Sequence, residues 1–342
     1  MNRRSMVGLT DVARAAGVSR STASRALRGE DRVSEETRTY VADIAASLGY
    51  VRDRRAADLA SNSPTAVGLV VRSAERSFYG EIASRVQDKI DDLGMDLLMA
   101  NGGDDHPAQM KALDSLIGRH LAGLIIASGR ASLPAAEHAA TFLPVVLVGF
   151  GSVSAAGIDT VSIDRASESI MVQAVLGEGH RHVAVTTAPA DASLTLYERW
   201  TSFETFLQAG GATVVLIPHE GIGDQGIFAQ ALREAIEDGV TAVMCGEDPT
   251  AVQVLELLHE WGIACPGEVS VTGFDGSGTF SSPLIGLTTF QQPVRQMAKD
   301  AVDLLMARVG GLQGPAEHRV HEGELLRGRT LGPVARADDE SA

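Results

Sequence analysis

Residues 9–27 read LTDVARAAGVSRSTASRAL, and this stretch predicts two short helices joined by a tight turn. The first helix is expected to cover about residues 11–16, with Thr10 as its candidate N-cap and Gly17 as its stop. Ser19 is the candidate N-cap of the second helix. The stretch therefore predicts a compact helix pair near the N-terminus.

A third helix is predicted shortly after this pair. Ser34 can cap it, and Glu35 and Glu36 in its first turn interact favourably with the helix dipole. Its inward-facing stripe is expected to consist of Val41, Ile44, Ala45 and Leu48. Three helices with so small a core form a module of about fifty residues that is only marginally stable by itself.

The rest of the chain alternates between apolar runs and helix-forming segments. A polar linker covers residues 51–65, the strand 67–71 opens the first block, and a second block begins after residue 164. The other predicted strands are 96–100, 123–127, 144–148, 182–187, 213–217, 242–245 and 269–273. Such alternation predicts parallel sheets covered on both faces, and two blocks in series predict two lobes with a ligand cleft between them.

Charge is distributed unevenly along the 342 residues, whose formal net charge is −15. Residues 1–60 carry 11 basic and 8 acidic side chains, which leaves 18 basic and 36 acidic side chains in the remainder. A basic module on an acidic body suits a protein that meets DNA only through that module. Because no apolar run of membrane-spanning or signal-peptide length occurs, we expect a cytoplasmic protein.

Residues 9–27 resemble the helix-turn-helix of the lactose-repressor (LacI/GalR) family, and residues 33–38 and 48–50 resemble its third helix. Similar motifs follow in family order at residues 179–182, 199–203, 266–271, 273–275 and 287–293. The resemblance implies an all-α headpiece joined to an α/β sensor similar to periplasmic binding proteins, with two doubly wound parallel-sheet lobes. The implied bounds are 8–50 for the headpiece, 51–65 for the hinge helix and linker, 66–164 with 291–321 for the first lobe, and 165–290 with 322–342 for the second.

The resemblance also implies which headpiece residues contact DNA. Arg20, Ser21 and Arg25 occupy the positions that read base edges in the major groove, where the planar fork of arginine matches guanine. Leu59 matches a leucine that the family inserts into the minor groove. Backbone contacts are expected from Thr10, Ser19, Thr22, Ser24 and Tyr50.

The hinge departs from the family pattern. Arg52 and Asp53 stand where a proline–asparagine pair is common, and Ala57 and Asp58 replace an arginine that commonly precedes the leucine. The sequence leaves open whether this hinge kinks DNA.

The ligand cleft implied by the resemblance is lined by side chains at strand ends. The expected effector contacts are Phe78, Tyr79, Asn101, Ser128, Phe150, Asp164, Arg199, Glu247, Asp248 and Asp275. Carboxylates accept hydrogen bonds from paired hydroxyls, arginine donates in a fork and aromatic rings cover apolar edges, so a sugar is the expected effector. A nucleoside or purine is the alternative, because Phe150 stands where a purine-sensing member carries a stacking ring. Glu247 replaces a usual asparagine and Arg165 departs from the family pattern at another position, which leaves the identity of the effector open.

Two other classes of protein compete with a DNA-binding repressor. An enzyme is disfavoured, because residues 149–154 match only half of a dinucleotide fingerprint and follow the fourth strand of their block. Two cysteines without zinc-ligand spacing give no reason to expect a metal, and no cofactor is expected. The other alternative is a cytoplasmic ligand-binding protein without a role on DNA. A homodimer is expected, since two headpieces on a two-fold axis match an inverted repeat.

Overall fold

The computed structural model describes residues 7–29, 32–50, 64–103, 106–129, 133–150, 157–219 and 225–334. The chain separates into two units, Met1–Ser63 and Pro64–Ala342, each with its own core. The expected hinge helix, with Arg52, Asp53, Ala57, Asp58 and Leu59, lies outside the described residues. Within the described ranges, no helix is long and apolar enough to span a lipid bilayer.

The N-terminal unit consists of three helices, α1 (Leu9–Ala15), α2 (Arg20–Arg28) and α3 (Glu35–Ser47). Ser19 and Ser34 cap α2 and α3 as predicted, because each hydroxyl oxygen accepts a hydrogen bond from the backbone N–H three residues later. The buried residues of the core are all small or β-branched: Val12, Ala13, Ala16, Ala23, Ala26, Val33, Val41 and Ala45.

Two details of this unit differ from the sequence prediction. The N-cap of α1 is Gly8 and not Thr10, because the Asp11 carboxylate accepts a hydrogen bond from the Gly8 N–H at 3.0 Å and the helix starts earlier. Leu48 follows the last residue of α3 and is 38% exposed, so it does not extend the inward-facing stripe.

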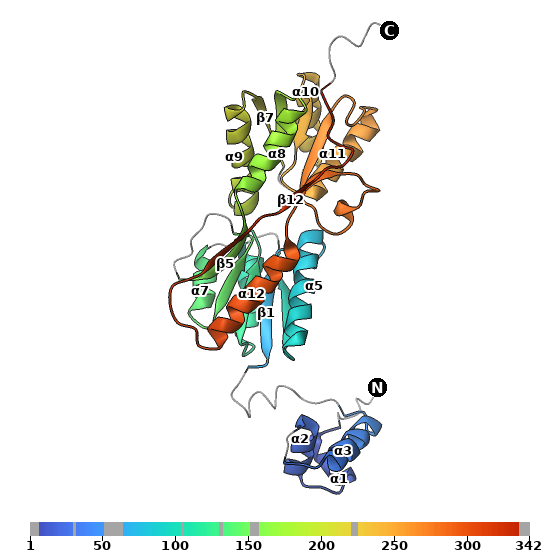
Figure 1. Cartoon of the computed structure of the whole chain (residues 1–342), viewed down its shortest axis with the longest axis vertical. Helices are drawn as coiled ribbons and strands as arrows, with labels where there is room; N and C mark the ends of the chain where they lie inside the picture. Colours follow the sequence, from blue (N-terminus) through green and yellow to red (C-terminus); the bar gives the residue numbers. More distant parts are fainter. Residues whose placement is uncertain are drawn as a thin grey trace. The chain divides into compact units, whose positions relative to one another are not determined.

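The second unit contains two six-stranded sheets, each covered by helices (Figure 1). The order of the first sheet is β11 (His318–His321), β5 (Asp159–Ile163), β4 (Val145–Val148), β3 (Gly123–Ala127), β1 (Ala66–Val71) and β2 (Asp96–Asn101). The order of the second is β12 (Glu324–Leu326), β10 (Thr288–Gln291), β9 (Ser270–Asp275), β8 (Ala242–Met244), β6 (His182–Thr187) and β7 (Thr213–Pro218). Of these strands only β12 pairs in the antiparallel direction, so the predicted parallel-sheet fold is confirmed for both lobes.

Helices cover both faces of each sheet. The first sheet lies between α5 (Ser77–Asp92) with α12 (Val294–Val309) and α6 (His106–Ile117) with α7 (Leu133–Ala140). The second lies between α8 (Ala166–Gly177) with α9 (Leu194–Ala209) and α10 (Gln225–Glu237) with α11 (Asp248–Trp261). Because both sides of a central strand are buried, β3 and β4 consist of apolar residues and glycine only.

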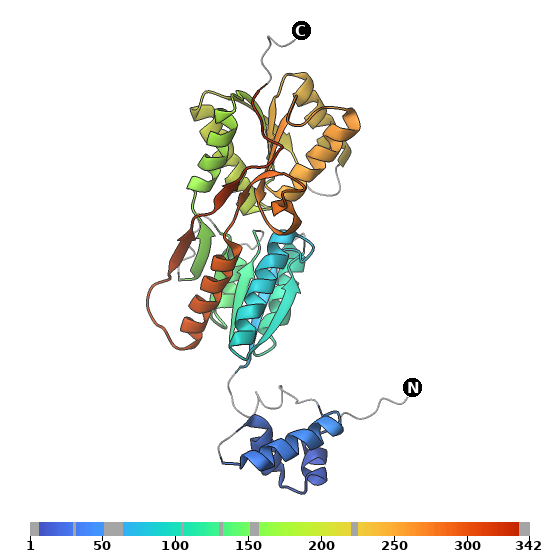
Figure 2. The same cartoon turned by 45° about the vertical axis from the view of Figure 1, so that its right-hand side comes forward.

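The chain passes between the two lobes three times. It leaves the first lobe after β5, returns through α12 and β11, and enters the second lobe again with β12. Figures 1 and 2 show the orange-red α12 beside the light-blue α5, although the two helices are far apart in the sequence. Neither lobe is therefore formed by one contiguous stretch of the chain.

A buried ion pair fixes the returning helix α12 to the first sheet. Both carboxylate oxygens of Asp159, at the start of β5, accept hydrogen bonds of 2.8 Å from the guanidinium of Arg308 near the end of α12. Asp159 Oδ1 also accepts a hydrogen bond of 2.7 Å from the Glu317 N–H, and the Asp159 side chain is 2% exposed. Burial alone would raise the pKa of Asp159, but these hydrogen bonds outweigh it and hold the pKa below its ordinary value.

We expect Asp159→Asn to lower the free energy of unfolding by about 2–4 kcal/mol, because the substitution leaves Arg308 without its charged partner. Urea unfolding of the full chain measures the loss. The folded-state pKa lies below the value of about 3.9 in an unfolded chain, so the carboxylate stabilises fully at neutral pH and its contribution is lost as the pH falls below about 4. The difference between wild type and variant should therefore shrink in acid. Asp238→Asn, at an exposed position after α10, is the control, and equal losses in both variants would contradict the assignment.

Candidate DNA-binding helix and ligand cleft

The first turn of α2 gathers hydroxyl groups around its N-cap. Ser19 Oγ accepts a hydrogen bond of 3.0 Å from the Thr22 N–H and lies 2.8 Å from the hydroxyl oxygens of Ser21 and Thr22. The cap uses a lone pair of this oxygen, so the O–H hydrogen of Ser19 is still able to donate. Capping of α2 and donation to a phosphate are therefore compatible roles for Ser19.

The side chains predicted to read DNA lie on the accessible side of α2. Arg20 and Ser21 are exposed, and Thr22, Ser24 and Arg25 are half-buried. In the part of the chain that the structure describes, neither arginine forms an ion pair with a carboxylate. Both guanidinium groups are therefore available to an external acceptor.

The remaining expected DNA contacts lie outside α2. Thr10 is exposed on the first turn of α1. Tyr50 follows α3 and is half-buried against the headpiece core, so its ring also contributes to the stability of the module. Leu59 falls outside the described residues.

We expect Ser19→Ala to destabilise the start of α2, because the substitution removes the acceptor for the Thr22 N–H. A lost cap costs about 1 kcal/mol, which corresponds to roughly fivefold faster amide hydrogen exchange in residues 20–28. Exchange measured by mass spectrometry on the full chain tests this expectation. Ser47→Ala, at an exposed position in the last turn of α3, should leave exchange in α2 unchanged, and the same rate in wild type and S19A would contradict the capping role.

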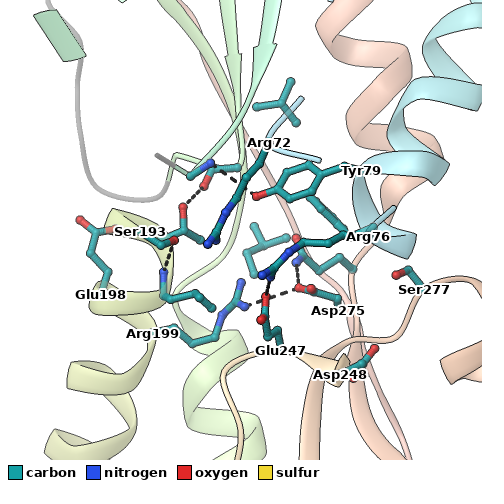
Figure 3. A pocket seen from close by; sticks show the side chains of 18 of the residues that line it. Arg72, Arg76, Tyr79, Ser193, Glu198, Arg199, Glu247, Asp248, Asp275 and Ser277 are labelled. Atoms are coloured by element: carbon teal, nitrogen blue, oxygen red, sulfur yellow. Dashed lines mark hydrogen bonds and ion pairs between the residues drawn. The ribbon is translucent and has the colours of Figure 1, made fainter. Parts of the chain in front are cut away.

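A cavity of about 1000 Å³, part of it open to solvent, lies between the two lobes. Parallel sheets collect polar side chains at the carboxyl ends of their strands, and the strand ends of both lobes meet here. The labelled residues of the first lobe in Figure 3 are Arg72, Arg76 and Tyr79. Those of the second lobe are Ser193, Glu198, Arg199, Glu247, Asp248, Asp275 and Ser277.

Arg199 is the central cation on the second-lobe side of the cavity. It is 4% exposed, donates a hydrogen bond to the Gly246 carbonyl, and lies with its guanidinium 3.8 Å from the centre of the Phe274 ring. Its Nη1 is 3.5 Å from Asp275 Oδ1, which also accepts a hydrogen bond of 2.6 Å from the Gln292 side chain. Burial raises the pKa of Asp275 to about 6, although the charge of Arg199 opposes the shift.

Asp248 lines the same cavity, but its carboxylate is occupied within the protein. Its Oδ1 accepts a hydrogen bond of 2.5 Å from the Thr289 hydroxyl, and its Oδ2 accepts one of 2.8 Å from the Gly276 N–H. Burial, followed by the charge of Asp275, raises its pKa. Asp248 therefore holds the loop after β9 against the start of α11.

An ion pair joins the two lobes at the cavity. Arg76 precedes α5 in the first lobe, and its Nη1 contacts the Oε2 of Glu247, which precedes α11 in the second lobe. The two side chains are 26% and 11% exposed. The contact is therefore partly shielded from water and stabilises the arrangement in which the lobes approach each other.

Six of the ten expected effector contacts line the cavity: Phe78, Tyr79, Arg199, Glu247, Asp248 and Asp275. The structure places the other four elsewhere. Asn101 accepts a hydrogen bond of 3.1 Å from the Ala74 N–H, and Asp164 accepts one of 2.7 Å from the Ala166 N–H at the start of α8. Both side chains fix loops at the rim of the first sheet.

Ser128 and Phe150 are buried in the first lobe. Ser128 is 1% exposed and lies 3.5 Å from the side-chain nitrogen of Gln109 on α6. Phe150 is 3% exposed and packs in the apolar cluster beneath α6 and α7. Gly149 has a φ of +82°, which ends the strand alternation and turns the next ring away from the cleft.

Sequence reasoning missed several lining residues. They are Arg72, Arg76, Ser77, Glu168, Ser193, Glu198, Ser277 and Gln292. One of them carried a detectable signal: Arg72 directly follows the apolar strand 67–71, at the end where a parallel sheet places its ligand.

Unpartnered polar atoms gather around the cavity. In the described residues, the buried side-chain atoms without a hydrogen-bond partner include Arg72 Nε, Arg199 Nε and Glu168 Oε2, and all three residues line this cavity. Buried polar groups are normally hydrogen-bonded, because an unsatisfied group costs about 1–3 kcal/mol. Their concentration here indicates a binding site for a polar ligand.

Comparison with known proteins agrees with both parts of the molecule. Residues 8–53 match the family model for bacterial regulatory proteins of the lacI family, and residues 172–331 match a periplasmic binding protein-like domain. The HTH-type transcriptional regulator MalR of Streptomyces coelicolor is 29% identical over 336 residues, which cover 94% of this chain and 96% of that protein. The chain belongs to the LacI family of bacterial regulatory proteins.

Two further comparisons extend this result. The ribose operon repressor of Haemophilus influenzae is 26% identical to this LacI-family chain over 317 residues, which cover 89% of the chain and 92% of that protein. The fold is that of the lac repressor dimer bound to operator and the anti-inducer ONPF, with a TM-score of 0.81 and 23% identity over 96% of this chain and 100% of that one. This LacI-family protein is therefore a DNA-binding transcription regulator and not an enzyme.

We expect Glu247→Gln to favour separation of the lobes in this LacI-family regulator, because the substitution removes the charge that faces Arg76 from the other lobe. Loss of a charge-assisted hydrogen bond of about 1.5 kcal/mol would shift the ratio of open to closed forms roughly tenfold. Spin labels at the exposed positions Asp88 and His259, in a Cys265→Ser background, report this shift as a longer distance in pulsed electron resonance. Glu260→Gln is the exposed control, and an unchanged distance distribution in E247Q would contradict a latching role.

Proposed function

We propose that this LacI-family regulator works in the cytoplasm as a homodimeric repressor that binds an inverted-repeat operator, and that a sugar held between the sensor lobes sets its affinity for DNA. The observation that carries the proposal is the group of unpartnered buried polar atoms on Arg72, Glu168 and Arg199 around the cleft. A site that is incomplete without a hydrogen-bonding ligand is what a sensor requires.

A sugar fits the chemistry of this cleft. Carboxylate oxygens of Asp275 and Glu168 accept hydrogen bonds from hydroxyl groups, and Arg199 donates to ring or hydroxyl oxygens. The rings of Phe78 and Tyr79, whose centroids are 5.3 Å apart, offer apolar surface for the face of a sugar ring. One relative is named for the ribose operon, which agrees with a sugar as effector.

A purine effector loses its main support. That alternative depended on Phe150 as a stacking ring, and Phe150 is buried in the core beneath α6 and α7. We therefore propose a sugar as the effector.

The DNA-reading roles assigned to the headpiece follow from position and accessibility. Arg20, Ser21 and Arg25 are proposed to read base edges, and Ser19, Thr22, Ser24, Thr10 and Tyr50 to contact the sugar-phosphate backbone. The free guanidinium of Arg25 suits bidentate contact with guanine. Leu59 is proposed as the minor-groove contact of the hinge.

Thermodynamic linkage between ligand binding and DNA binding would allow the cleft to control the headpiece. A ligand shifts the equilibrium between open and closed lobes only by its difference in affinity for the two forms. A coupling of about 1–3 kcal/mol would change operator affinity by roughly 5- to 150-fold. The chain crosses between the lobes three times, and the first lobe begins directly after the headpiece linker in the sequence, so a change of lobe angle can be transmitted to the linker through the chain.

We expect the full-length protein to enrich an inverted repeat from a pool of random DNA duplexes. Arg25→Ala should weaken binding to the enriched site by about 1–3 kcal/mol and relax the preference at one position in each half-site. Arg233→Ala, in the sensor, is the matched control and should bind like wild type. Operator affinity is then measured with and without a panel of sugars. If no DNA duplex is enriched at low salt, the DNA-binding part of the proposal is wrong. If no sugar of the panel changes the affinity for the operator, the sensing part is wrong.

A further inference from the structure

Arg72 differs from the other arginines at the ligand cleft. It follows β1 directly, is 6% exposed and lines the cavity. No hydrogen bond or ion pair joins its guanidinium to any residue in the described ranges, and its Nε is buried without a partner. Among the described residues, this buried cation therefore has no anionic partner.

The other lining arginines face carboxylates. Arg199 lies 3.5 Å from the Asp275 carboxylate, and Arg76 contacts Glu247. Arg165 is exposed to solvent, where water compensates its charge. Arg72 has no carboxylate partner in the described ranges, and at 6% exposure it has far less contact with water than Arg165.

Tyr79 does not neutralise Arg72. Figure 3 shows Arg72 entering the cavity from the first-lobe side, between Tyr79 and Ser193. Burial raises the pKa of Tyr79 above its ordinary value of 10, so its hydroxyl group stays protonated at physiological pH. The tyrosine can donate or accept one hydrogen bond, but it carries no charge to pair with the guanidinium.

A buried unpaired charge is costly, and a ligand with the opposite charge would remove that cost. We propose that the effector is a polyhydroxy carboxylate, that is, a sugar acid whose carboxylate pairs with Arg72 while its hydroxyl groups bind Asp275 and Glu168. The inference deepens the proposed function and rests on it, because it names the class of sugar that the same cleft takes.

The cleft favours a carboxylate over a phosphate. A single planar guanidinium matches the two oxygens of a carboxylate in a bidentate contact. A sugar phosphate would bring close to two negative charges into a cavity whose lining already includes Glu168, Glu198, Glu247 and Asp275. One unpaired arginine balances one negative charge.

Isothermal titration calorimetry on the full-length protein tests the inference. The probes are gluconate, galactonate, glucuronate and galacturonate, with glucose, galactose and sorbitol as neutral counterparts and glucose 6-phosphate as the phosphate form. We expect at least one acid to bind about tenfold or more tightly than its neutral counterpart. Arg72→Met should remove this preference, so that the affinity for the acid falls about tenfold or more relative to the affinity for its neutral counterpart.

Two further variants separate binding from folding. Arg72→Lys keeps the charge without the fork, so it should retain part of the preference for acids. Arg295→Met replaces an exposed arginine on α12 and should bind like wild type. Arg72→Met should also raise the melting temperature of the ligand-free protein, because it removes an uncompensated buried charge.

The outcomes distinguish this inference from the proposed function. If neutral sugars or the phosphate bind and change operator affinity while no acid binds, the sensor stands and the sugar-acid inference is wrong. An acid preference that survives in R72M would equally overturn the role of Arg72. If no compound of the panel binds, the sugar-acid inference is overturned. If, in addition, no sugar changes the affinity for the operator, the proposed sensing function is overturned as well.

Discussion

Burial of both faces of each parallel sheet is the constraint on which the rest of the sensor depends. Strands such as β3 and β4 are covered by helices on either side, so they leave no place for polar side chains along their length. The polar side chains that can meet a ligand therefore follow the strand ends, and the carboxyl ends of the two sheets face the same cavity. The chemistry of the cleft is a consequence of how the two cores are packed.

The same constraint explains how far the sequence could predict the structure. The caps at Ser19 and Ser34 and the alternation of apolar strands with helices are local signals, so the headpiece helices and the two-lobed fold class could be predicted. Which residues line the cleft depends on the direction in which each side chain points, one or two positions after the end of a strand. Phe150 and Asp164 stand at such positions, but a glycine turn sends one into the core and a helix start captures the other. Arg72 was missed for the opposite reason, because a charge after an apolar run is usually solvated.

Ligand sensing and stability are connected in this cleft. Two arginines and a glutamate contribute buried polar atoms that no group in the described part of the chain satisfies, and each lowers the stability of the ligand-free sensor. A ligand that satisfies them stabilises the conformation in which it is bound, in proportion to its concentration and affinity. Under the proposed function, ligand binding would recover this free energy, and the difference in affinity between the open and closed forms would set how far the ligand shifts their ratio.

The return of α12 to the first lobe has a consequence for synthesis on the ribosome. Val294, Met297, Ala298 and Leu305 cover one face of the first sheet, yet they are translated after all the strands of the second lobe except β12. The first lobe therefore emerges with part of its core open to water, and it stays so until α12 has been synthesised. During that interval the nascent chain exposes apolar surface of the first sheet, and such surface makes a partly folded chain prone to aggregation.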